Sequence, residues 1–446
     1  MKKHPLTSKK SKVWLVAVLA FVLCTLIATL AGCAPDEPQD PDDGLEFIVP
    51  EGPADETFGL NGETPTDISY FKYEEIDDGT IAITGTYTQA TELTKIVIPA
   101  VIDGKKVSRL YDSALATLYS LEEVVVSGYV VDIRPYAFRD CWSLKTIKLP
   151  GNLLRLSEGA FQGCKSIKDL SFIVPSVKVI GDRVFEGCES LSTAKIPDTV
   201  TKVGEYTFLN CTSLTEVQFA SGMTTIPNRM FQGCSALVKT TGSDTFVIPA
   251  KIDTIGEFAF SGCVSLTKFS IPDTVKNLGK CIFVGCEALS EVAFPAGITA
   301  IPERMFDGCI SLKTTTGNTE FVIPETVKTI GESAFNECNF RDVVLNNGLE
   351  TIGKNAFANC QRARNISIPD TVKSVGELAF SGCTMLKEIK MPIVDKMTIG
   401  KNIFDGCKKL EKITVKSGSD AESYANDWAG KAAELDKYAA ITVITQ

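Results

Sequence analysis

A phenylalanine followed three residues later by a cysteine returns about every 23 residues through most of this chain, and this spacing constrains the fold more than any other feature. A fixed period of this length is typical of a solenoid, in which each unit packs only on its neighbours. Leu115 and Leu118 hold the same two positions in a degenerate first coil. Twelve copies carry both residues, and the phenylalanines that we expect to form the repeat core are Phe138, Phe161, Phe185, Phe208, Phe231, Phe260, Phe283, Phe306, Phe335, Phe357, Phe380 and Phe404.

One coil can be followed from Cys188 to Cys211. Apolar residues alternate with polar ones over residues 191–196, which predicts a short strand, and Pro197 ends it because proline cannot donate to a further ladder bond. Glu205 comes where a single helical turn would begin, since a carboxylate complements the exposed N–H groups there. The residue before the cysteine is glycine in eight copies and asparagine or aspartate in three, which predicts a left-handed stop. We therefore expect an α/β repeat solenoid with one short strand and one helical turn per coil.

The chain beyond the repeats predicts a cap at each end of the stack. One coil buries too little apolar surface to offset the ordering of its residues, so the terminal coils need covering. We expect an N-terminal strand cap over residues 67–110, the solenoid over 111–416, and a C-terminal cap of helix and strand over 417–446. Ser419 and Glu422 form a capping-box pattern that would open this helix.

Residues 1–32 have the pattern of an export signal. Five lysines precede an uncharged apolar run over residues 13–30, and Leu30-Ala31-Gly32-Cys33 follows. This motif resembles the bacterial lipobox, in which the chain is cut before the cysteine and the sulfur receives a diacylglycerol. The alternative is an uncleaved anchor, since 18 apolar residues can just span a bilayer. Both readings place the rest of the chain outside the cytoplasm, and we expect Cys33 to be lipidated and to hold the protein on the cell membrane.

Residues 33–66 predict an acidic, disordered tether. Residues 34–67 hold eleven acidic side chains and no lysine or arginine, and like charges extend such a stretch. After removal of residues 1–32, 40 basic and 55 acidic residues remain, which gives a net charge of −15. This charge disfavours nucleic acid and anionic lipid as partners of the folded part.

The repeats resemble the BspA-type leucine-rich repeats of bacterial surface proteins, with their pattern A-F-x-G-C-x-x-L-x-x-I-x-I-P. The entry over residues 80–85 with Ile98-Pro99 and the exit over residues 418–425 are similar to the first coil and the end of that family. The resemblance covers about residues 67–446. It implies a leucine-rich-repeat solenoid in a cell-surface protein that attaches to host matrix or to other microbes. It implies no particular ligand, because such scaffolds serve many partners.

The residue types of catalytic and metal sites are scarce. The single histidine, His4, lies in the segment expected to be removed, which excludes a Ser-His-Asp triad, a Cys-His pair and an imidazole metal ligand from the mature chain. Asp198, Asp273 and Asp370 recur in the motif I-P-D-T-V, but coils three or four apart place them about 15–20 Å from one another, too far to share a calcium ion. Turn formation accounts for these aspartates. We expect neither an enzyme nor a cofactor.

Twelve of the fifteen cysteines recur once per coil, which indicates a stack of small, buried, free thiols. Disulfides between adjacent coils are the alternative, since rungs about 5 Å apart lie within reach, although parallel Cα–Cβ directions suit the bond poorly. Cys281 departs from the pattern. We expect it to be a partly covered surface residue, with a reactive thiol as the alternative.

Candidate ligand contacts lie at exposed strand positions and in two Thr-rich loops that lengthen two of the coils. We expect the strands to line a concave face, which at the middle exposed position is a polar ribbon without Trp, Tyr or Arg, the usual residues of binding centres. For the loops, solvated spacers are the alternative. The candidates are Lys148, Lys195, Gln218, Lys390, Thr241, Asp244, Thr315 and Asn318.

These observations together predict a lipid-anchored surface protein whose repeat domain binds a macromolecular partner, an extracellular protein or glycan. The alternative is a structural or glycan-binding protein of its own cell envelope. Aromatic residues gathered on one exposed face would favour that alternative.

Overall fold

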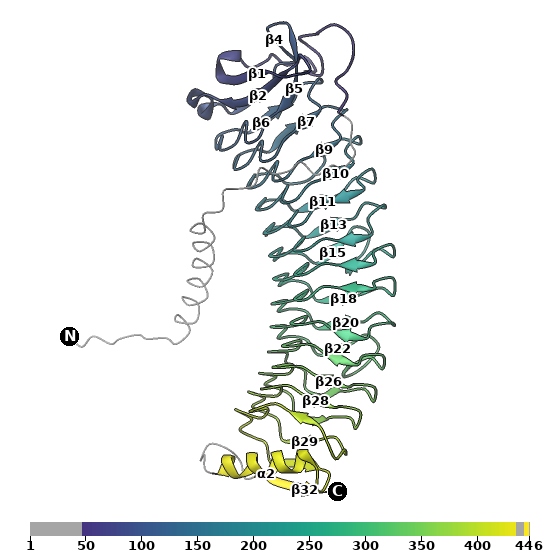
Figure 1. Cartoon of the computed structure of the whole chain (residues 1–446). Helices are drawn as coiled ribbons and strands as arrows, with labels where there is room; N and C mark the ends of the chain where they lie inside the picture. Colours follow the sequence, from purple (N-terminus) through teal and green to yellow (C-terminus); the bar gives the residue numbers. More distant parts are fainter. Residues whose placement is uncertain (1–46, 434–440, 446) are drawn as a thin grey trace, which may run out of the picture. The chain divides into compact units, whose positions relative to one another are not determined.

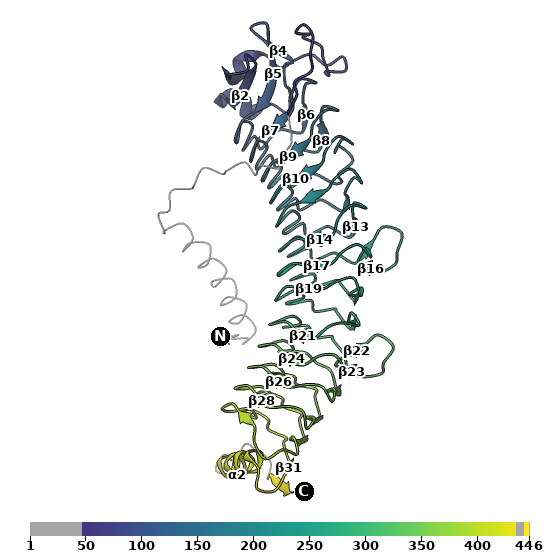
Figure 2. The same ribbon diagram turned by 45° about the vertical axis from the view of Figure 1, so that its right-hand side comes forward.

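The computed structural model describes residues 47–433 and 441–445. The predicted signal segment, Cys33 and the tether up to residue 46 lie outside the described residues. From Phe47 onward the chain forms one compact unit, in which short coils stack one upon the next (Figures 1 and 2). The predicted solenoid is confirmed.

One side of the stack is a column of mostly three-residue strands, the long-strand column. Its strands pair in parallel and in register, so that Val217 lies between Ala194 and Thr240 of the adjacent coils. Their central residues point into the core and the outer ones into solvent, and we call this exposed side the strand face. The bounds are Lys95–Val97 (β3), Glu123–Val125 (β6), Thr146–Lys148 (β8), Thr193–Lys195 (β11), Glu216–Gln218 (β13), Lys239–Thr240 (β15), Phe246–Val247 (β16), Lys268–Ser270 (β18), Glu291–Ala293 (β20), Thr314–Thr315 (β22), Phe321–Val322 (β23), Val343–Val344 (β25), Asn365–Ser367 (β27), Glu388–Lys390 (β29), Lys412–Val415 (β31) and Thr442–Thr445 (β32).

A second column of two-residue strands, the short-strand column, was not anticipated from the sequence. The residues after the I-P-D-T-V turn pair in parallel with the same residues of the next coil, as Thr254 does with Asn277. Labels of this column lie left of the long-strand column in Figure 2. The bounds are Asp132–Ile133 (β7), Arg155–Leu156 (β9), Val179–Ile180 (β10), Lys202–Val203 (β12), Thr225–Ile226 (β14), Thr254–Ile255 (β17), Asn277–Leu278 (β19), Ala300–Ile301 (β21), Thr329–Ile330 (β24), Thr351–Ile352 (β26), Ser374–Val375 (β28) and Thr398–Ile399 (β30).

Additional elements stand at both ends of the stack. At the N-terminal end, β1 and β2 form an antiparallel pair, and β2 and β5 continue into the short-strand column. At the C-terminal end, Ser419 Oγ accepts a hydrogen bond from Glu422 N (3.1 Å) at the start of the helix, and β32 extends the long-strand column. The cap elements are Ile68–Tyr70 (η1), Phe71–Glu75 (β1), Ile81–Thr86 (β2), Thr88–Glu92 (η2), Val101–Ile102 (β4), Lys105–Leu110 (β5) and Asp420–Ala433 (α2).

The segment between the short strand and the cysteine is a pair of turns, so the predicted helical turn of each coil is not confirmed. Around Phe208, both Tyr206 and Asn210 have φ of +58°, and the equivalent positions have positive φ in all twelve copies. Two left-handed residues four apart interrupt an α-helical run. Instead, Tyr206, Phe208 and Asn210 donate their N–H groups to the next coil over 2.8–3.1 Å. The predicted left-handed stop before each cysteine is confirmed.

The core is one continuous apolar column running through the coils. Each repeat phenylalanine is fully buried, and its ring stacks on that of the neighbouring coil with centroids 5.2–6.4 Å apart. The repeat cysteines are buried and free, as predicted. Phe340 replaces the leucine that normally follows the cysteine by three residues, and it follows Cys338 by only two. That coil is one residue shorter, and its strand β25 pairs with β23 and not with β27, so the long-strand column is interrupted there.

Candidate ligand-binding surfaces

The four predicted strand residues lie on the strand face, where Lys195 and Gln218 are neighbours on the paired strands β11 and β13, while Lys148 and Lys390 lie in other coils. Lys148, Lys195, Gln218 and Lys390 are the last residues of β8, β11, β13 and β29. Lys148 is already engaged, since its Nζ lies 3.0 Å from Glu63 Oε1 and 3.1 Å from Glu123 Oε1. Lys390 and Gln218 each line a separate hollow. These residues therefore mark three places on one face rather than one site.

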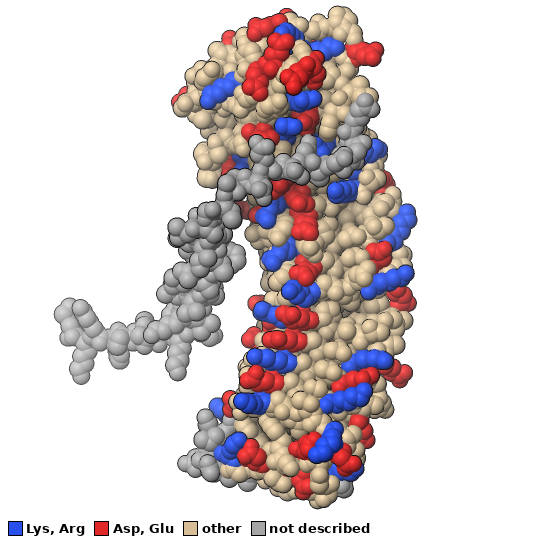
Figure 3. Space-filling model, in the orientation of Figure 1, with Lys and Arg blue, Asp and Glu red and all other residues tan. Residues whose placement is uncertain are grey.

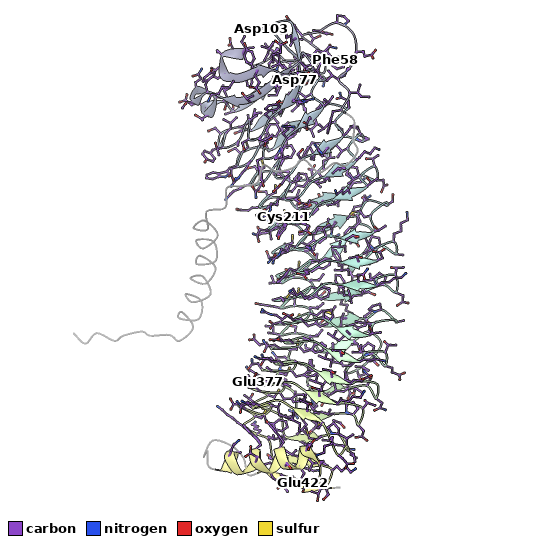
Figure 4. The ribbon with its side chains drawn as sticks, in the orientation of Figure 1. Phe58, Asp77, Asp103, Cys211, Glu377 and Glu422 are labelled. Atoms are coloured by element: carbon purple, nitrogen blue, oxygen red, sulfur yellow. The ribbon has the colours of Figure 1, made fainter. Side chains whose placement is uncertain are left out.

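The first of these places is covered by the chain itself. Residues 47–66, assigned above to the tether, lie against the first coils and the loop after β6. Leu60 is 1 % exposed and packs on Val97 and Val125, the last residues of β3 and β6. Phe58, labelled in Figure 4, stacks on Tyr129 with ring centroids 4.5 Å apart. The last position of three successive strands is thus occupied by a polypeptide segment.

Ion pairs and main-chain bonds complete this contact. Glu63 lies 2.8 Å from Lys95 Nζ as well as 3.0 Å from Lys148 Nζ, and the hydrogen bonds from these two lysines lower the pKa of the Glu63 carboxyl. Thr66 N donates to the carbonyl of Val97 (3.0 Å), and Val97 N donates to Thr66 Oγ1 (2.9 Å). Apolar anchoring, charge pairing and main-chain bonding all act together here.

The inserted loops are held mainly by their own side chains. Thr315 is buried, and its Oγ1 accepts hydrogen bonds from Val322 N (3.3 Å) and from Asn318 Nδ2 (3.0 Å). Thr241 Oγ1 donates to Glu216 Oε1 (2.7 Å). Asp244 is exposed. Of the four loop candidates, three therefore serve the loop structure, which favours the spacer interpretation.

Exposed charges on the strand face are paired from coil to coil. The prediction from sequence rested on the middle exposed strand position, so these pairs at the first position were not predicted. At the first position of the strands, Lys239 Nζ lies 3.1 Å from Glu216 and Lys268 Nζ 2.9 Å from Glu291. A hydrogen bond from Thr241 and the Lys239 contact lower the pKa of Glu216. Each of these exposed ion pairs contributes little stability. Because positive and negative side chains alternate, the first strand position has no electrostatic potential of a single sign.

An open hollow of about 440 Å³ lies where the long-strand column is interrupted between β25 and β27. Val344, 41 % exposed, and Leu345 give it an apolar floor. Its charged lining residues are Glu320, Asp342, Glu388 and Lys390. Asp342 lies 3.5 Å from Arg341 Nε and Glu388 lies 3.5 Å from Lys412 Nζ, whereas Glu320 forms no ion pair among the described residues, so the hollow favours a ligand with apolar groups and a basic group beside Glu320. A hollow of about 370 Å³ beside β13 and the first inserted loop includes Gln218 and Thr241.

Arginine and aromatic side chains alternate along the turn edge, the side of the stack formed by the pairs of turns that precede the repeat cysteines, where no binding residue was predicted. At the left-handed position two residues before the repeat phenylalanine, Arg183 lies 4.0 Å from the ring centroid of Tyr206, and Arg229 lies 4.1 Å from that of Phe258. These contacts stabilise neighbouring coils.

Cys281 holds the next place in this column and is 3 % exposed, so the expectation of a partly covered surface residue was wrong. Burial raises the pKa of its thiol, which disfavours reactivity.

Charges of both signs alternate on the same edge. Figure 3 shows lysine or arginine and aspartate or glutamate following one another down the side of the stack, where Figure 4 labels Glu377. Lys354 Nζ lies 3.4 Å from Glu377 Oε2. This alternation gives the edge no net field with which to hold a polyanion.

The recurring aspartates act between coils and are not brought together. Asp198 Oδ1 accepts a hydrogen bond from Ser221 N (2.8 Å), and Asp273 and Asp370 make the same bond to Ala296 N and Ile393 N. Each aspartate therefore fastens its turn to the next coil. Within residues 47–433 and 441–445, no group of three or more His, Cys, Asp or Glu side chains could hold a metal ion.

No helix of the described part of the chain is long and apolar enough to cross a membrane. The predicted signal segment lies outside that part.

Comparisons with known proteins identify the repeat type. A family model described as the BspA type leucine rich repeat region (6 copies) matches residues 108–238, 238–318 and 315–427. A leucine-rich repeat protein from Bacteroides ovatus is similar in structure, with 24% identity, a TM-score of 0.66, and coverage of 85% of this chain and 100% of the other. A leucine rich cell surface protein from Faecalibacterium prausnitzii has 25% identity, a TM-score of 0.52, and coverage of 81% and 98%. No curated protein sequence matches the chain.

Proposed function

This chain belongs to the BspA-type leucine-rich repeat family, and on that premise we propose that it is a lipid-anchored cell-surface protein whose strand face binds a segment of a partner protein. Surface placement is supported by the similarity to a cell surface protein of Faecalibacterium prausnitzii. The lipobox-like sequence ending in Cys33 supports the lipid anchor. Two acyl chains hold a protein on a membrane durably.

The observation that carries the proposal is the contact of residues 58–66 with the first coils. There the strand face already holds a polypeptide segment through the apolar anchor Leu60, the carboxylate of Glu63 and the main chain of Thr66. In the later coils, no other segment of the described residues covers this face. A partner segment can use the same three kinds of contact there.

The hollow beside β25 is the place that we propose for this partner. Val344 and Leu345 would take an apolar side chain, and Glu320, which forms no ion pair among the described residues, would attract a basic residue beside it. The mature chain's net charge of −15 acts in the same direction over longer range. The partner is thus a segment with an apolar anchor flanked by lysine or arginine, from host matrix or from another microbe.

Cell adhesion tests this proposal. Cells carrying the full chain are compared with cells carrying Val344→Asp for attachment to immobilised collagen, fibronectin, fibrinogen and laminin and to co-resident bacteria. Val264→Asp, an equally small substitution at a position 37 % exposed outside the strand face, is the matched control. We expect attachment to fall at least fivefold for Val344→Asp alone. Equal attachment of all three strains to every surface contradicts the proposal, as does equal attachment by a strain that lacks the repeats.

The anchor has a separate test. Metabolic labelling with a fatty-acid probe should mark the wild-type chain and not Cys33→Ser, which should keep residues 1–32 and migrate as the longer precursor. Labelling of neither chain would favour the uncleaved anchor, and labelling of both would indicate acylation at another residue.

We propose no catalytic activity, because the mature chain has no histidine and the described thiols are buried. The alternative, a structural or glycan-binding protein of its own envelope, gains no support from the strand face, whose predicted contact positions carry no aromatic ring.

A further inference from the structure

A separate hollow of about 320 Å³ opens at the N-terminal end of the stack. Its walls come from the chain that leaves β2, residues 85–91, and from the first coil, residues 113–118. None of its lining residues carries a charge at neutral pH. This distinguishes it from the hollow beside β25, which three carboxylates line, and it disfavours an ionic ligand.

One exposed tyrosine lines this hollow, and an exposed tyrosine–tryptophan pair begins at the residue after its last lining residue. Among the described residues, the large hydrophobic side chains left exposed include one tryptophan and two tyrosines: Trp142 (45 %), Tyr119 (47 %) and Tyr87 (48 %). Tyr87 lines the hollow, and Tyr119 follows the lining residue Leu118. The rings of Tyr119 and Trp142 lie against each other with centroids 4.3 Å apart. Exposed aromatic rings that cluster beside a hollow mark an interaction site.

Two lysines lie near these rings. Lys165 Nζ lies 5.4 Å from the ring centroid of Trp142, and Lys72 Nζ lies 5.4 Å from that of Tyr87. Neither lysine is a lining residue of the hollow.

The backbone at this hollow is strained, and the strain places a hydroxyl group in its wall. Thr117 has φ of +63°. It stands at the position before the repeat cysteine, where the other twelve coils have Gly, Asn, Asp or Glu. A β-branched residue in this conformation is an outlier that costs free energy. Within the described part of the chain, the hydroxyls of Thr117, Thr86 and Ser113 make no hydrogen bond, so they are available to a ligand.

We propose that this hollow binds a neutral sugar unit of a glycan chain. The C–H face of a pyranose ring packs on the aromatic ring of Tyr87, while its hydroxyls exchange hydrogen bonds with the threonine and serine hydroxyls, and the next unit of the glycan can reach the Tyr119–Trp142 pair. The absence of charged lining residues matches a neutral sugar, since a charged one would be desolvated without a partner. This site lies apart from the strand-face hollow and does not depend on the peptide-binding proposal.

Oligosaccharide titration of the full chain tests the site. The protein is kept in a detergent without a sugar headgroup and titrated with cellohexaose, maltohexaose, laminarihexaose and chitohexaose, with a heparin hexasaccharide as the charged probe. Calorimetry gives the affinity, and the change in tryptophan fluorescence is assigned to Trp142 where it disappears in Trp142→Ala, because the chain also holds Trp14 and Trp428. We expect at least one neutral hexasaccharide to bind and to change the fluorescence.

Variants then locate the binding. Trp142→Ala and Tyr87→Ala should each weaken it about tenfold. Ile310→Ala should leave it unchanged, because Ile310 has the same position after the cysteine in a distant coil and is 44 % exposed. Thr117→Gly should weaken binding severalfold while raising the melting temperature, since glycine adopts the left-handed conformation without strain.

The proposal is overturned if no neutral hexasaccharide binds at millimolar concentration, if only the heparin fragment binds, or if Trp142→Ala and Tyr87→Ala bind as wild type does. Val344→Asp should leave sugar binding intact, so failure of the strand-face proposal can be told from failure of this one.

Discussion

The thiol of Cys211 donates a hydrogen bond to the main-chain carbonyl of Phe185 in the preceding coil, with Sγ and oxygen 3.1 Å apart. The same bond recurs along the stack, as from Cys234 to Phe208 at 3.1 Å. Figure 4 labels Cys211 within this stack. The repeat cysteine therefore fills space as a small hydrophobe and also ties each coil to the one before it.

Replacing Cys211 should cost more stability than replacing a buried cysteine outside the ladder. Cys211→Ala removes both buried volume and the bond to Phe185, and we expect the free energy of unfolding to fall by about 1–2 kcal/mol. Cys281→Ala is the matched control, because Cys281 is buried but has no equivalent bond among the described residues. Urea denaturation followed by circular dichroism measures both. Equal losses would show that the bond contributes nothing.

Thiol reagents should separate the native from the unfolded chain. All thirteen cysteines of the described residues are buried and free. With an aromatic disulfide reagent at pH 8, we expect none of the thirteen to react in the native protein and all of them to react in guanidinium chloride. A similar number of reactive thiols in both states would mean that the coils do not share one closed interior.

Stability should fall as the pH rises above about 9. Burial raises the pKa of Cys286 and of Cys141 from 9.0 to about 12. Between these values the unfolded chain loses protons that the folded chain keeps, so stability that is intact below pH 9 is lost progressively up to about pH 12. Melting temperatures from pH 7 to pH 11 measure the loss. In Cys286→Ala, the free energy of unfolding should fall above pH 9 by about 1.4 kcal/mol per pH unit less than in the wild type. An unchanged dependence on pH would contradict the assignment of this loss to Cys286.

Asp198 should matter through its acceptor oxygen and, to a smaller extent, through its charge. Asp198→Ala removes the acceptor of the Ser221 N–H and should lower the melting temperature, whereas Asp198→Asn keeps an acceptor oxygen and should lower it less. The exposed loop residue Asp244 is the control, and Asp244→Ala should have no effect. The hydrogen bond from Ser221 lowers the pKa of Asp198, so its contribution is present above the unfolded value of 3.8 and is lost as the pH falls below it. Scanning calorimetry would refute this if Asn and Ala behaved alike.

Leu60 should hold residues 47–66 on the first coils. Leu60→Ala removes the apolar anchor that packs on Val97 and Val125, at a local cost of about 2–3 kcal/mol, and should make this segment the first site of limited proteolysis. Ile48→Ala is the control, because Ile48 is 65 % exposed in the same segment. Wild-type cleavage kinetics in Leu60→Ala would mean that other contacts hold the segment.

Features that repeat with the coil could be predicted, because each coil has the same neighbours. The buried phenylalanines, the free buried thiols, the left-handed residue before each cysteine and the helix that starts after Ser419 follow from residue type and spacing alone. The short-strand column was not predicted because its two-residue strands exist only through pairing with the next coil. Two residues are too few to show the alternation of apolar and polar side chains that indicates a strand. The left-handed residue two before the phenylalanine was missed because bulky residues such as Tyr206 and Arg229 stand there.

The candidate sites were predicted less well, since they depend on contacts between distant residues. Among the predicted residues, Lys148 and Thr315 already have partners inside the molecule, whereas Lys390 lies in an open hollow. The aromatic cluster could have been found by reading the position after each cysteine, where Trp142 stands, instead of the strand positions alone.

By itself the sequence determined the stack, because a 23-residue period forces every coil to bury the same side chains against the same neighbours. Only the tertiary structure decided which parts of the surface stay open. Glu63 and Lys148 are 85 residues apart in the chain yet form an ion pair, and Tyr87 and Thr117 from different coils line one hollow. Such contacts between residues distant in sequence depend on how far each coil is displaced from the next, and a local pattern of residue types does not encode this displacement.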